Sequence, residues 1–419
     1  IKEGNLNPFN QKDSIVICSF QFASTKAAYL KKTNWDLVII DEAHRLRNVY
    51  KPTNKMGNAI KNALEDYKKV LLTATPLQNS ILELYGLVSL IDPYVFGDLK
   101  SFKSQFSRLV EEENFSDLRN RLQPVCKRTL RRQVLEYIKY TKRIPLVEEY
   151  FPGEDEMTLY KWVSDYLQQG KLFALPSSQR QLMTLILRKL LASSTYAIYG
   201  TLDALVKKLD AIIEKHVVPT PEDLALDFET FEEVVDEWAN EDEEPENIEE
   251  EIEYTDEEIE LIKDEKADLE RFRDLAHKIR KNDKAEKLFT ALERGFSELN
   301  KLGANQKALI FTESRRTQDF IYNLLESRGY RGKVVCFNGV NNDPKSNEIY
   351  KAYCKKHKDT DVLSGSATAD KRAAIVEYFK NEATIMIATE AAAEGINLQF
   401  CSLIVNFDLP WNPQRIEQR

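Results

Sequence analysis

The sequence predicts an α/β protein in which two parallel-sheet domains are separated by a helical and acidic insertion. Three observations lead to this prediction. Short apolar runs alternate with helical patterns over the first 100 residues, the same alternation resumes near Asp283, and the region between them combines helical spacing with dense negative charge. Such alternation is typical of parallel sheets, whose strands are joined by crossover helices.

Residues 1–150 are predicted to form the first sheet domain. Strand-like and helical runs follow one another in this order: 14–20, 22–32, 36–40, 56–67 and 70–75. The pattern becomes helical after Pro93 and then passes through a basic stretch, residues 127–143, with seven basic residues and one acid. That stretch fits a nucleic-acid groove, a nucleotide cleft or a solvated helix face.

Residues 151–282 are predicted to be the insertion, because apolar residues recur at helical spacing from Tyr160 to Leu209. Its acidic segment, residues 222–260, has 21 acidic residues and no lysine or arginine. This charge density predicts a mobile loop or a loosely packed helix. A protein partner could dock on this segment.

Residues 283–419 are predicted to form the second sheet domain. Its expected strands are 307–313, 333–339, 384–389 and 403–409, and its expected helices are 287–300, 317–329 and 370–381.

The net charge of −9 arises from the acidic segment, residues 222–260. Outside residues 222–260, 59 basic residues face 47 acidic ones, which is the balance expected of a protein that touches phosphates. The five cysteines are scattered without metal-ligand spacing, and the four histidines are equally dispersed, so a zinc site is not expected. No apolar stretch approaches the roughly 20 residues that span a bilayer, and we expect a cytoplasmic protein without a membrane partner.

The most informative run is LVIIDEAH, residues 37–44. Apolar residues that end abruptly in Asp41 and Glu42 predict a buried parallel strand, which delivers two carboxylates to the sheet edge where α/β proteins bind ligands. Asp41 is the expected magnesium ligand, and Glu42 the expected base that activates water beside a γ-phosphate, with a share in the metal through water. His44, at the mouth of the turn, is expected to connect this site to neighbouring motifs.

A second apolar strand ends in Thr73, Ala74 and Thr75, and Pro76 fixes the exit of the chain. Hydroxyl groups at this edge are expected to bond either the Asp41 and Glu42 carboxylates or the partner domain, and to sense the γ-phosphate.

Polar residues also follow the strands of the second sheet domain, which favours a surface that tracks a ligand. They are Ser314 and Arg315, Asn338 and Gly339, Thr389, Gly395 and Asn397, and Trp411 and Asn412.

Taken in order, the motifs DEAHRLRN, LLTATPLQN, LRRQV, KALIFTE, ATEAAAEGINL and FDLPWNPQRIEQR resemble the Swi/Snf-type branch of superfamily-two helicases and translocases. The bacterial, RapA-like subgroup is the most similar. The resemblance implies two RecA-like lobes that close on ATP and Mg²⁺ and move along double-stranded DNA, usually without separating its strands. In a bacterium such a protein is nucleoid-associated.

The resemblance also implies roles for single residues. Asp41 and Glu42 match the family's motif II, and Thr73 and Thr75 match motif III. Thr389, Gly395 and Asn397 match motif V, and the resemblance implies that Gly395 and Asn397 lie near the nucleotide. Gln418 begins motif VI and is also expected at the nucleotide.

Three departures from the family pattern qualify this resemblance. The phosphate loop, Gly-Lys-Ser or Gly-Lys-Thr, is absent, and the chain stops before the expected arginine fingers. Glu390 and Ala391–Ala393 stand where many eukaryotic relatives carry a basic residue and glycines. We expect an internal portion of a longer protein that is inactive by itself.

The expected function is that of an ATP-dependent double-stranded DNA translocase that remodels or displaces protein–DNA complexes. Two alternatives remain open at this point: a DEAH-type RNA helicase, and a non-catalytic nucleic-acid-binding scaffold.

Overall fold

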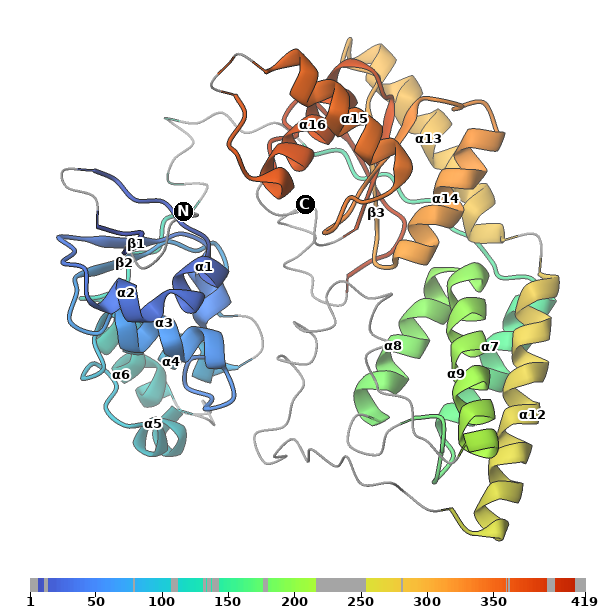
Figure 1. The fold of residues 1–419 in the computed structure, drawn as a ribbon, viewed down its shortest axis with the longest axis horizontal. Helices are drawn as coiled ribbons and strands as arrows, with labels where there is room; N and C mark the ends of the chain where they lie inside the picture. Colours follow the sequence, from blue (N-terminus) through green and yellow to red (C-terminus); the bar gives the residue numbers. More distant parts are fainter. Residues whose placement is uncertain are drawn as a thin grey trace. The chain divides into compact units, whose positions relative to one another are not determined.

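The computed structural model describes residues 7–10, 14–77, 80–106, 112–130, 133, 137, 143–175, 180–215, 254–279, 282–358, 360, 362–389 and 396–410. The chain divides into two compact units, Ile1–Arg143 and Ile144–Arg419 (Figure 1). The finer division at residues 150 and 282 stays a prediction. Among the described residues, no helix combines the length and the apolarity that crossing a membrane requires.

The first unit contains a parallel pair of strands, β1 (Val38–Ile40) and β2 (Lys69–Leu71), with Ile39 opposite Val70. One face of the pair is covered by helices, and Ile40 is buried there in an apolar cluster. Ile39 and Val70 point to the other face and are 61% and 41% exposed. The helical elements of this unit are α1 (Phe20–Thr25), α2 (Ala27–Lys31), η1 (Ala43–Leu46), α3 (Lys55–Ala63), α4 (Ile81–Ile91), α5 (Leu99–Phe106) and α6 (Glu112–Leu122).

The strand predicted over residues 14–20 is wrong. Residues 14–19 belong to no strand, and Phe20 opens α1, where the Ser19 hydroxyl accepts a hydrogen bond from the amide of Phe22 at 3.2 Å. Ile15 and Ile17 are each 92% exposed. Apolar, β-branched composition favours a strand only where a neighbouring strand supplies hydrogen bonds and packing, and in the described part of this unit β1 and β2 pair only with each other.

The second unit contains a four-stranded parallel sheet in the order β4-β5-β3-β6. Its strands are β3 (Ala308–Thr312), β4 (Val334–Phe337), β5 (Ile385–Thr389) and β6 (Leu403–Asn406), and its helices are α13 (Asp283–Lys301), α14 (Arg315–Ser327), α15 (Pro344–Lys356) and α16 (Ala367–Asn381). The α/β class with parallel sheets is therefore confirmed.

Residues of β3 alternate between two apolar layers. Ala308 and Ile310 pack against residues of α13 and α14, whereas Leu309 and Phe311 pack against residues of α15 and α16. Both faces of the sheet are thus covered, as expected for parallel strands that read as continuous apolar runs. This burial on both sides leaves the strand ends as the places where polar groups emerge.

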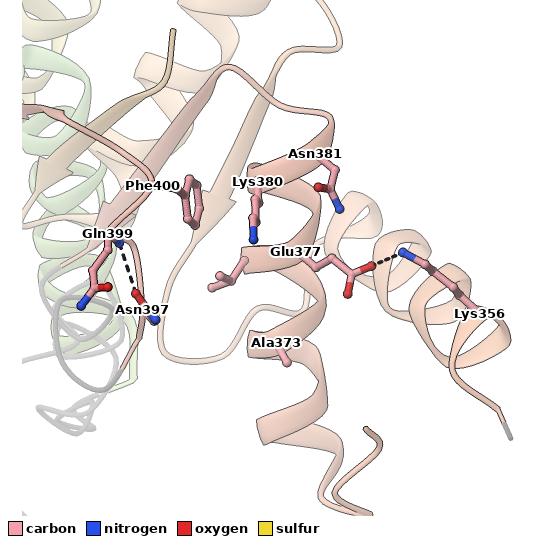
Figure 2. A pocket seen from close by; sticks show the side chains of 9 residues that line it. Lys356, Ala373, Glu377, Lys380, Asn381, Asn397, Gln399 and Phe400 are labelled. Atoms are coloured by element: carbon pink, nitrogen blue, oxygen red, sulfur yellow. Dashed lines mark hydrogen bonds and ion pairs between the residues drawn. The ribbon is translucent and has the colours of Figure 1, made fainter. Parts of the chain in front are cut away.

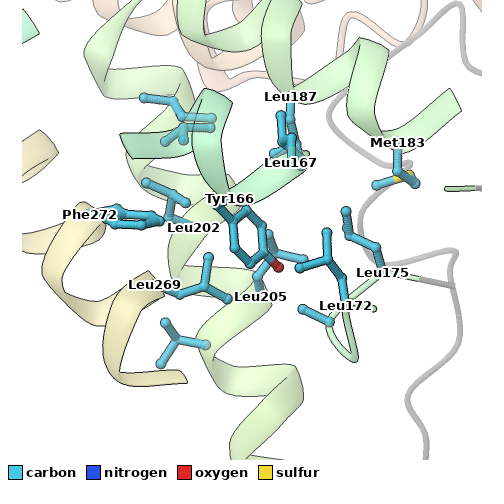
Figure 3. Close-up of a cluster of buried hydrophobic side chains, with 14 of the residues drawn as sticks. Tyr166, Leu167, Leu172, Leu175, Met183, Leu187, Leu202, Leu205, Leu269 and Phe272 are labelled. Atoms are coloured by element: carbon cyan, nitrogen blue, oxygen red, sulfur yellow. The ribbon is translucent and has the colours of Figure 1, made fainter. Parts of the chain in front are cut away.

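Four helices form a bundle in the same unit: α7 (Glu154–Leu167), α8 (Arg180–Ser193), α9 (Thr195–Lys215) and α12 (Asp256–Lys278). Their apolar faces share one buried cluster (Figure 3). The buried carboxylate of Glu265 accepts hydrogen bonds from the Tyr166 hydroxyl at 2.7 Å and from the amides of Phe173 and Ala174 at 2.7 and 3.0 Å. A buried acid is tolerated in this core because its oxygens are satisfied.

One helix agrees with an alternative that the sequence predicted, and another helix departs from the prediction. Residues 254–260, at the end of the predicted acidic segment, contain the start of α12, where Thr255 and Glu258 form a capping box. The rest of that segment lies outside the described residues. Helix α15 was not predicted, although Asp343 caps it and Pro344 occupies its first turn.

Candidate functional site

Asp41 and Glu42 leave β1 in a tight turn. The backbone of Glu42 is left-handed, with φ 49° and ψ 46°, and its amide donates a hydrogen bond to Oδ1 of Asp41 at 3.0 Å. The amide of Ala43 bonds the carbonyl of Leu72, just after β2, at 2.9 Å. A left-handed residue other than glycine costs about 1–3 kcal/mol, and such strain clusters at functional sites.

His44 connects this turn to the second strand. Its Nδ1 lies 3.2 Å from Oε2 of Glu42 and 3.4 Å from the hydroxyl of Thr73, which in turn accepts a hydrogen bond from the amide of Thr75 at 3.2 Å. The His44 side chain is 11% exposed, whereas that of Glu42 is 53% exposed. The structure therefore brings the five predicted catalytic residues together and leaves the Glu42 carboxylate open to a ligand.

Two features that the sequence analysis missed hold this turn in place. A Cβ atom added to Gly86 of α4 would lie 1.9 Å from the carbonyl oxygen of Arg47, so only glycine lets α4 approach the helical turn that contains His44. Nε of Arg47 lies 3.6 Å from the carboxylate of Glu83, whose side chain is 5% exposed. The helix thus supports the DEAH turn through direct backbone packing and a buried ion pair.

In the second unit, Gln318 joins two strand ends at the carboxyl edge of the sheet. Its buried Nε2 donates hydrogen bonds to the carbonyls of Phe337 in β4 and Ile387 in β5, at 3.0 and 2.7 Å. Its Oε1 accepts a hydrogen bond from Nδ2 of Asn338 at 3.0 Å. Asn338 and Asn341 also exchange bonds between their amides and side-chain oxygens, at 2.8 and 2.7 Å. The loop that contains Asn338 and Gly339 is therefore held at this edge.

Ser314 and Thr389 are interior residues of this edge. Ser314 is fully buried and caps α14, with its hydroxyl 3.5 Å from the amide of Thr317. Thr389 is 1% exposed and lies beside Thr312 in the register of β3 and β5. The hydroxyl of Ser314 is thus taken up by the cap, and contacts of either residue with nucleic acid stay predictions. Arg315 is the first residue of α14, at the same edge.

Asn397 lies in a polar groove of about 790 Å³ beside the C-terminal half of α16 (Figure 2). Its Oδ1 accepts a hydrogen bond from the amide of Gln399 at 3.2 Å. Lys356 and Lys380 also line the groove, and Lys356 is paired with Glu377. Gly395, Trp411, Asn412 and Gln418, together with Gln78 and Asn79, lie outside the described residues.

A buried carboxylate, Asp408, organises a polar cluster that the sequence analysis did not identify. It follows β6, and its Oδ2 accepts hydrogen bonds from the hydroxyls of Thr312 and Ser193, at 2.6 and 2.7 Å, and from the amide of Glu313 at 3.1 Å. Its Oδ1 lies 2.6 Å from Nζ of Lys284. These five residues, which we call the Asp408 cluster, come from β3, the turn after β3, the segment after β6, α8 and α13.

The electrostatics of the cluster favour the ionised acid. Burial alone raises the pKa of Asp408, but the Lys284 ammonium and the hydroxyls of Thr312 and Ser193 outweigh burial and hold that pKa below its usual range. A signal lay in the sequence, because LIVNFDL places an aspartate close to the end of an apolar run, two residues after β6 ends.

Comparisons with known protein families find two matches along the chain. Residues 3–189 match the SNF2-related domain, and residues 284–419 match the helicase conserved C-terminal domain. The two matches place the chain in the class of helicase-like proteins that are built from two such domains. Within this class, the first of the two domains is of the SNF2-related type.

Individual relatives cover different shares of the chain. It is 27% identical over 389 residues to the uncharacterized ATP-dependent helicase YqhH of Bacillus subtilis, a match that covers 92% of this chain and 52% of YqhH. It is 40% identical over 124 residues to mouse chromodomain-helicase-DNA-binding protein 6, covering 29% of this chain and 4% of that protein. The chain thus spans about half the length of YqhH and a small part of the mouse relative.

A solved structure is also similar: the Sulfolobus solfataricus SWI2/SNF2 ATPase core in complex with dsDNA. It has 16% sequence identity and a TM-score of 0.32, and the match covers 95% of this chain and 62% of the archaeal chain.

The lowered pKa of Asp408 predicts a stabilising contribution that disappears in acid. Because the folded pKa lies below the unfolded value of about 3.9, this contribution is present above that pH and is lost as the pH falls through the folded pKa. We expect wild type to melt above a double variant, Asp408→Asn with Lys284→Met, at pH 7. The gap in melting temperature should shrink below about pH 4.

Thermal melting of this chain from pH 7 to pH 3 measures that gap. Asp165→Asn, the same change at an exposed residue of α7, is the control and should keep a small, constant gap. A gap for the double variant that stays equally wide from pH 7 to pH 3 contradicts the prediction.

Proposed function

We propose that this chain is the motor part of an ATP-dependent double-stranded DNA translocase, which remodels or displaces protein–DNA complexes. The observation that supports this most strongly is the turn at Asp41 and Glu42. There, a strained backbone presents an exposed carboxylate, and His44 connects that carboxylate to the hydroxyl of Thr73. A carboxylate poised at a strand end in this way suits the activation of water beside a terminal phosphate.

The side chains at this turn fit Mg²⁺. Asp41 and Glu42 offer only oxygen atoms, and Mg²⁺ binds through one or two carboxylates together with substrate phosphates and water. The ranges that the structure describes hold no cluster of three or more histidine, cysteine or acidic side chains suited to a metal, in keeping with a magnesium site that depends on ATP. When bound, the metal would neutralise phosphate charge.

The chain's own residues then have distinct proposed roles. Asp41 helps to hold the metal with ATP, and Glu42 accepts the proton of the attacking water. His44 and Thr73 orient the Glu42 carboxylate, and Thr75 extends this contact along the turn after β2. Gly395, Asn397 and Gln418 are proposed to contact the nucleotide.

The carboxyl edge of the second sheet is the proposed nucleic-acid surface. Arg315 and the loop of Asn338 and Gly339 lie at this edge and are proposed to contact the phosphate backbone, which supplies most non-specific affinity. Ser314 and Thr389 support the edge from within. Trp411 and Asn412 are proposed to extend the surface. The basic balance outside residues 222–260 favours a nucleic-acid partner, and the name of the mouse relative favours DNA.

Glu42→Gln is expected to lower the DNA-stimulated rate of ATP hydrolysis at least about 100-fold, since a general base contributes about 10²–10⁴-fold. ATP affinity should stay within about threefold, because the amide keeps the shape of the side chain. The measurement is phosphate release from the complete gene product, with ATP binding followed separately. Glu65→Gln, at an exposed position of the same unit, is the matched control and should match wild type.

The same assay compares duplex DNA, single-stranded DNA and RNA. Strongest stimulation of wild type by duplex DNA supports the proposal, whereas far stronger stimulation by RNA identifies the RNA helicase instead. Phosphate release by Glu42→Gln at the wild-type rate would contradict the assigned base. No hydrolysis with any nucleic acid would favour the scaffold.

Arg315→Ala is expected to weaken duplex DNA binding several-fold and to lower the slope of log affinity against log salt by about one, because one phosphate contact is lost. Arg331→Ala is the control. Arg331 is exposed and precedes β4, at the opposite edge of the same sheet, so its loss should leave the slope unchanged. Equal slopes for the two variants would remove Arg315 from the proposed surface.

A further inference from the structure

The helical bundle and the sheet of the second unit meet at the corner between α8 and α9. Ser193 ends α8, and Ser194 lies between the two helices. Both hydroxyls lie within hydrogen-bond distance of the hydroxyl of Thr317 in α14, at 2.8 and 3.0 Å, and all three residues are buried. The bundle thus contacts Thr317 in the first turn of α14, the same turn that begins with Arg315 after the cap residue Ser314.

One oxygen atom completes this junction. Oδ2 of Asp408 accepts a hydrogen bond from Ser193 of the bundle and two more from the end of β3, through the Thr312 hydroxyl and the Glu313 amide. Since this oxygen binds both sides, a shift of the bundle relative to the sheet breaks a bond to a buried carboxylate. Such groups are costly to leave unsatisfied, so the bundle and the end of β3 are expected to move together.

Lys284 also connects the bundle to Asp408, through the second oxygen of the carboxylate. Its Nζ pairs with Asp408 Oδ1 and also donates hydrogen bonds to the carbonyls of Ala192 and Ser193, at 3.0 and 3.4 Å. These carbonyls belong to the C-terminal turn of α8, where the helix dipole favours a cation. The ammonium therefore satisfies the helix end and the buried acid at once.

Three further contacts seat the bundle on the sheet unit. Nζ of Lys189 in α8 lies 3.1 Å from the carboxylate of Glu313, and both side chains are nearly buried. The rings of Tyr196 and Phe320 stack with centroids 6.0 Å apart. Gly200 of α9 faces the guanidinium of Arg316, and a Cβ atom there would lie 1.4 Å from an Arg316 nitrogen. The close fit leaves little room for an alternative seating.

We propose that Ser193 and Asp408 are positioning residues, through which the seating of the helical bundle sets the geometry of the turn that leads to Arg315. A change in the position of the bundle would then change the position of Arg315 at the proposed nucleic-acid surface of the sheet. This inference rests on the proposed function, because it assigns the bundle a part in how duplex DNA is held. Neither residue touches the nucleic acid itself.

Ser193→Ala tests the proposal because it removes a single hydroxyl and leaves the Asp408–Lys284 pair in place. The matched control is Ser164→Ala, the same change in α7, away from the cluster. In the complete gene product we expect Ser193→Ala to raise the KM for duplex DNA in ATP hydrolysis about fivefold or more. The KM for ATP should stay within about twofold. Ser164→Ala should leave both constants at the wild-type values.

Gly200→Ala is the second variant, because it disturbs the seating of α9 without touching the Asp408 cluster. It is expected to raise the KM for duplex DNA in the same direction as Ser193→Ala. If both variants melt earlier but keep the wild-type KM for DNA, the cluster only stabilises the fold and the proposal is overturned. A parallel rise in both KM values for Ser193→Ala overturns it as well.

Amide hydrogen exchange of this chain tests the coupling without any activity. We expect Ser193→Ala to speed exchange at residues 312–318 about tenfold, while residues 38–40 of the first unit and the Ser164→Ala variant keep wild-type rates. Unchanged exchange at residues 312–318 overturns the coupling. Faster exchange in a protein that hydrolyses no ATP with any nucleic acid would leave the coupling standing and would refute the proposed function instead.

Discussion

The parallel pairing of strands is the constraint on which the candidate sites of both units depend. A parallel ladder aligns the carboxyl ends of neighbouring strands, so the residues that follow them meet at one edge. In the first unit this places the turn at Glu42 beside Thr73, because Ile40 and Leu71 are paired in register. In the second unit it aligns the ends of β3, β4, β5 and β6. Chemistry that is dispersed along the chain is thereby concentrated at two edges.

The buried charge of Asp408 shows how such an edge is stabilised. A carboxylate without partners would not stay ionised inside a protein, yet burial of Asp408 is tolerated because one cation, two hydroxyls and one amide satisfy it. Removing one partner of a buried pair typically costs about 3–5 kcal/mol. This sensitivity makes the cluster suited to holding the bundle and the strand ends in one arrangement, whereas a purely apolar contact would tolerate sliding.

Local patterns predicted much of the fold and the first site, and non-local contacts account for what they missed. The strand before Asp41 was predicted from its apolar run and the abrupt turn that follows it, but it is buried on one face only, because Ile39 is 61% exposed. The apolar run at residues 14–20 was misread, since composition does not reveal whether a neighbouring strand is present. Asp408 was missed because its partner Ser193 lies 215 positions away in the sequence. Only the folded structure shows that Asp408 is buried while Glu42 is exposed.

In the proposed function, hydrolysis at the Glu42 turn drives movement along duplex DNA. The most direct test is displacement of a fluorescent third strand from a DNA triplex by the complete gene product, with Glu42→Gln as the control. Wild type is expected to displace the third strand only when ATP is hydrolysed, while the duplex stays paired, and Glu42→Gln is expected to displace none. DNA-stimulated hydrolysis by wild type without displacement of the third strand would contradict the proposed function.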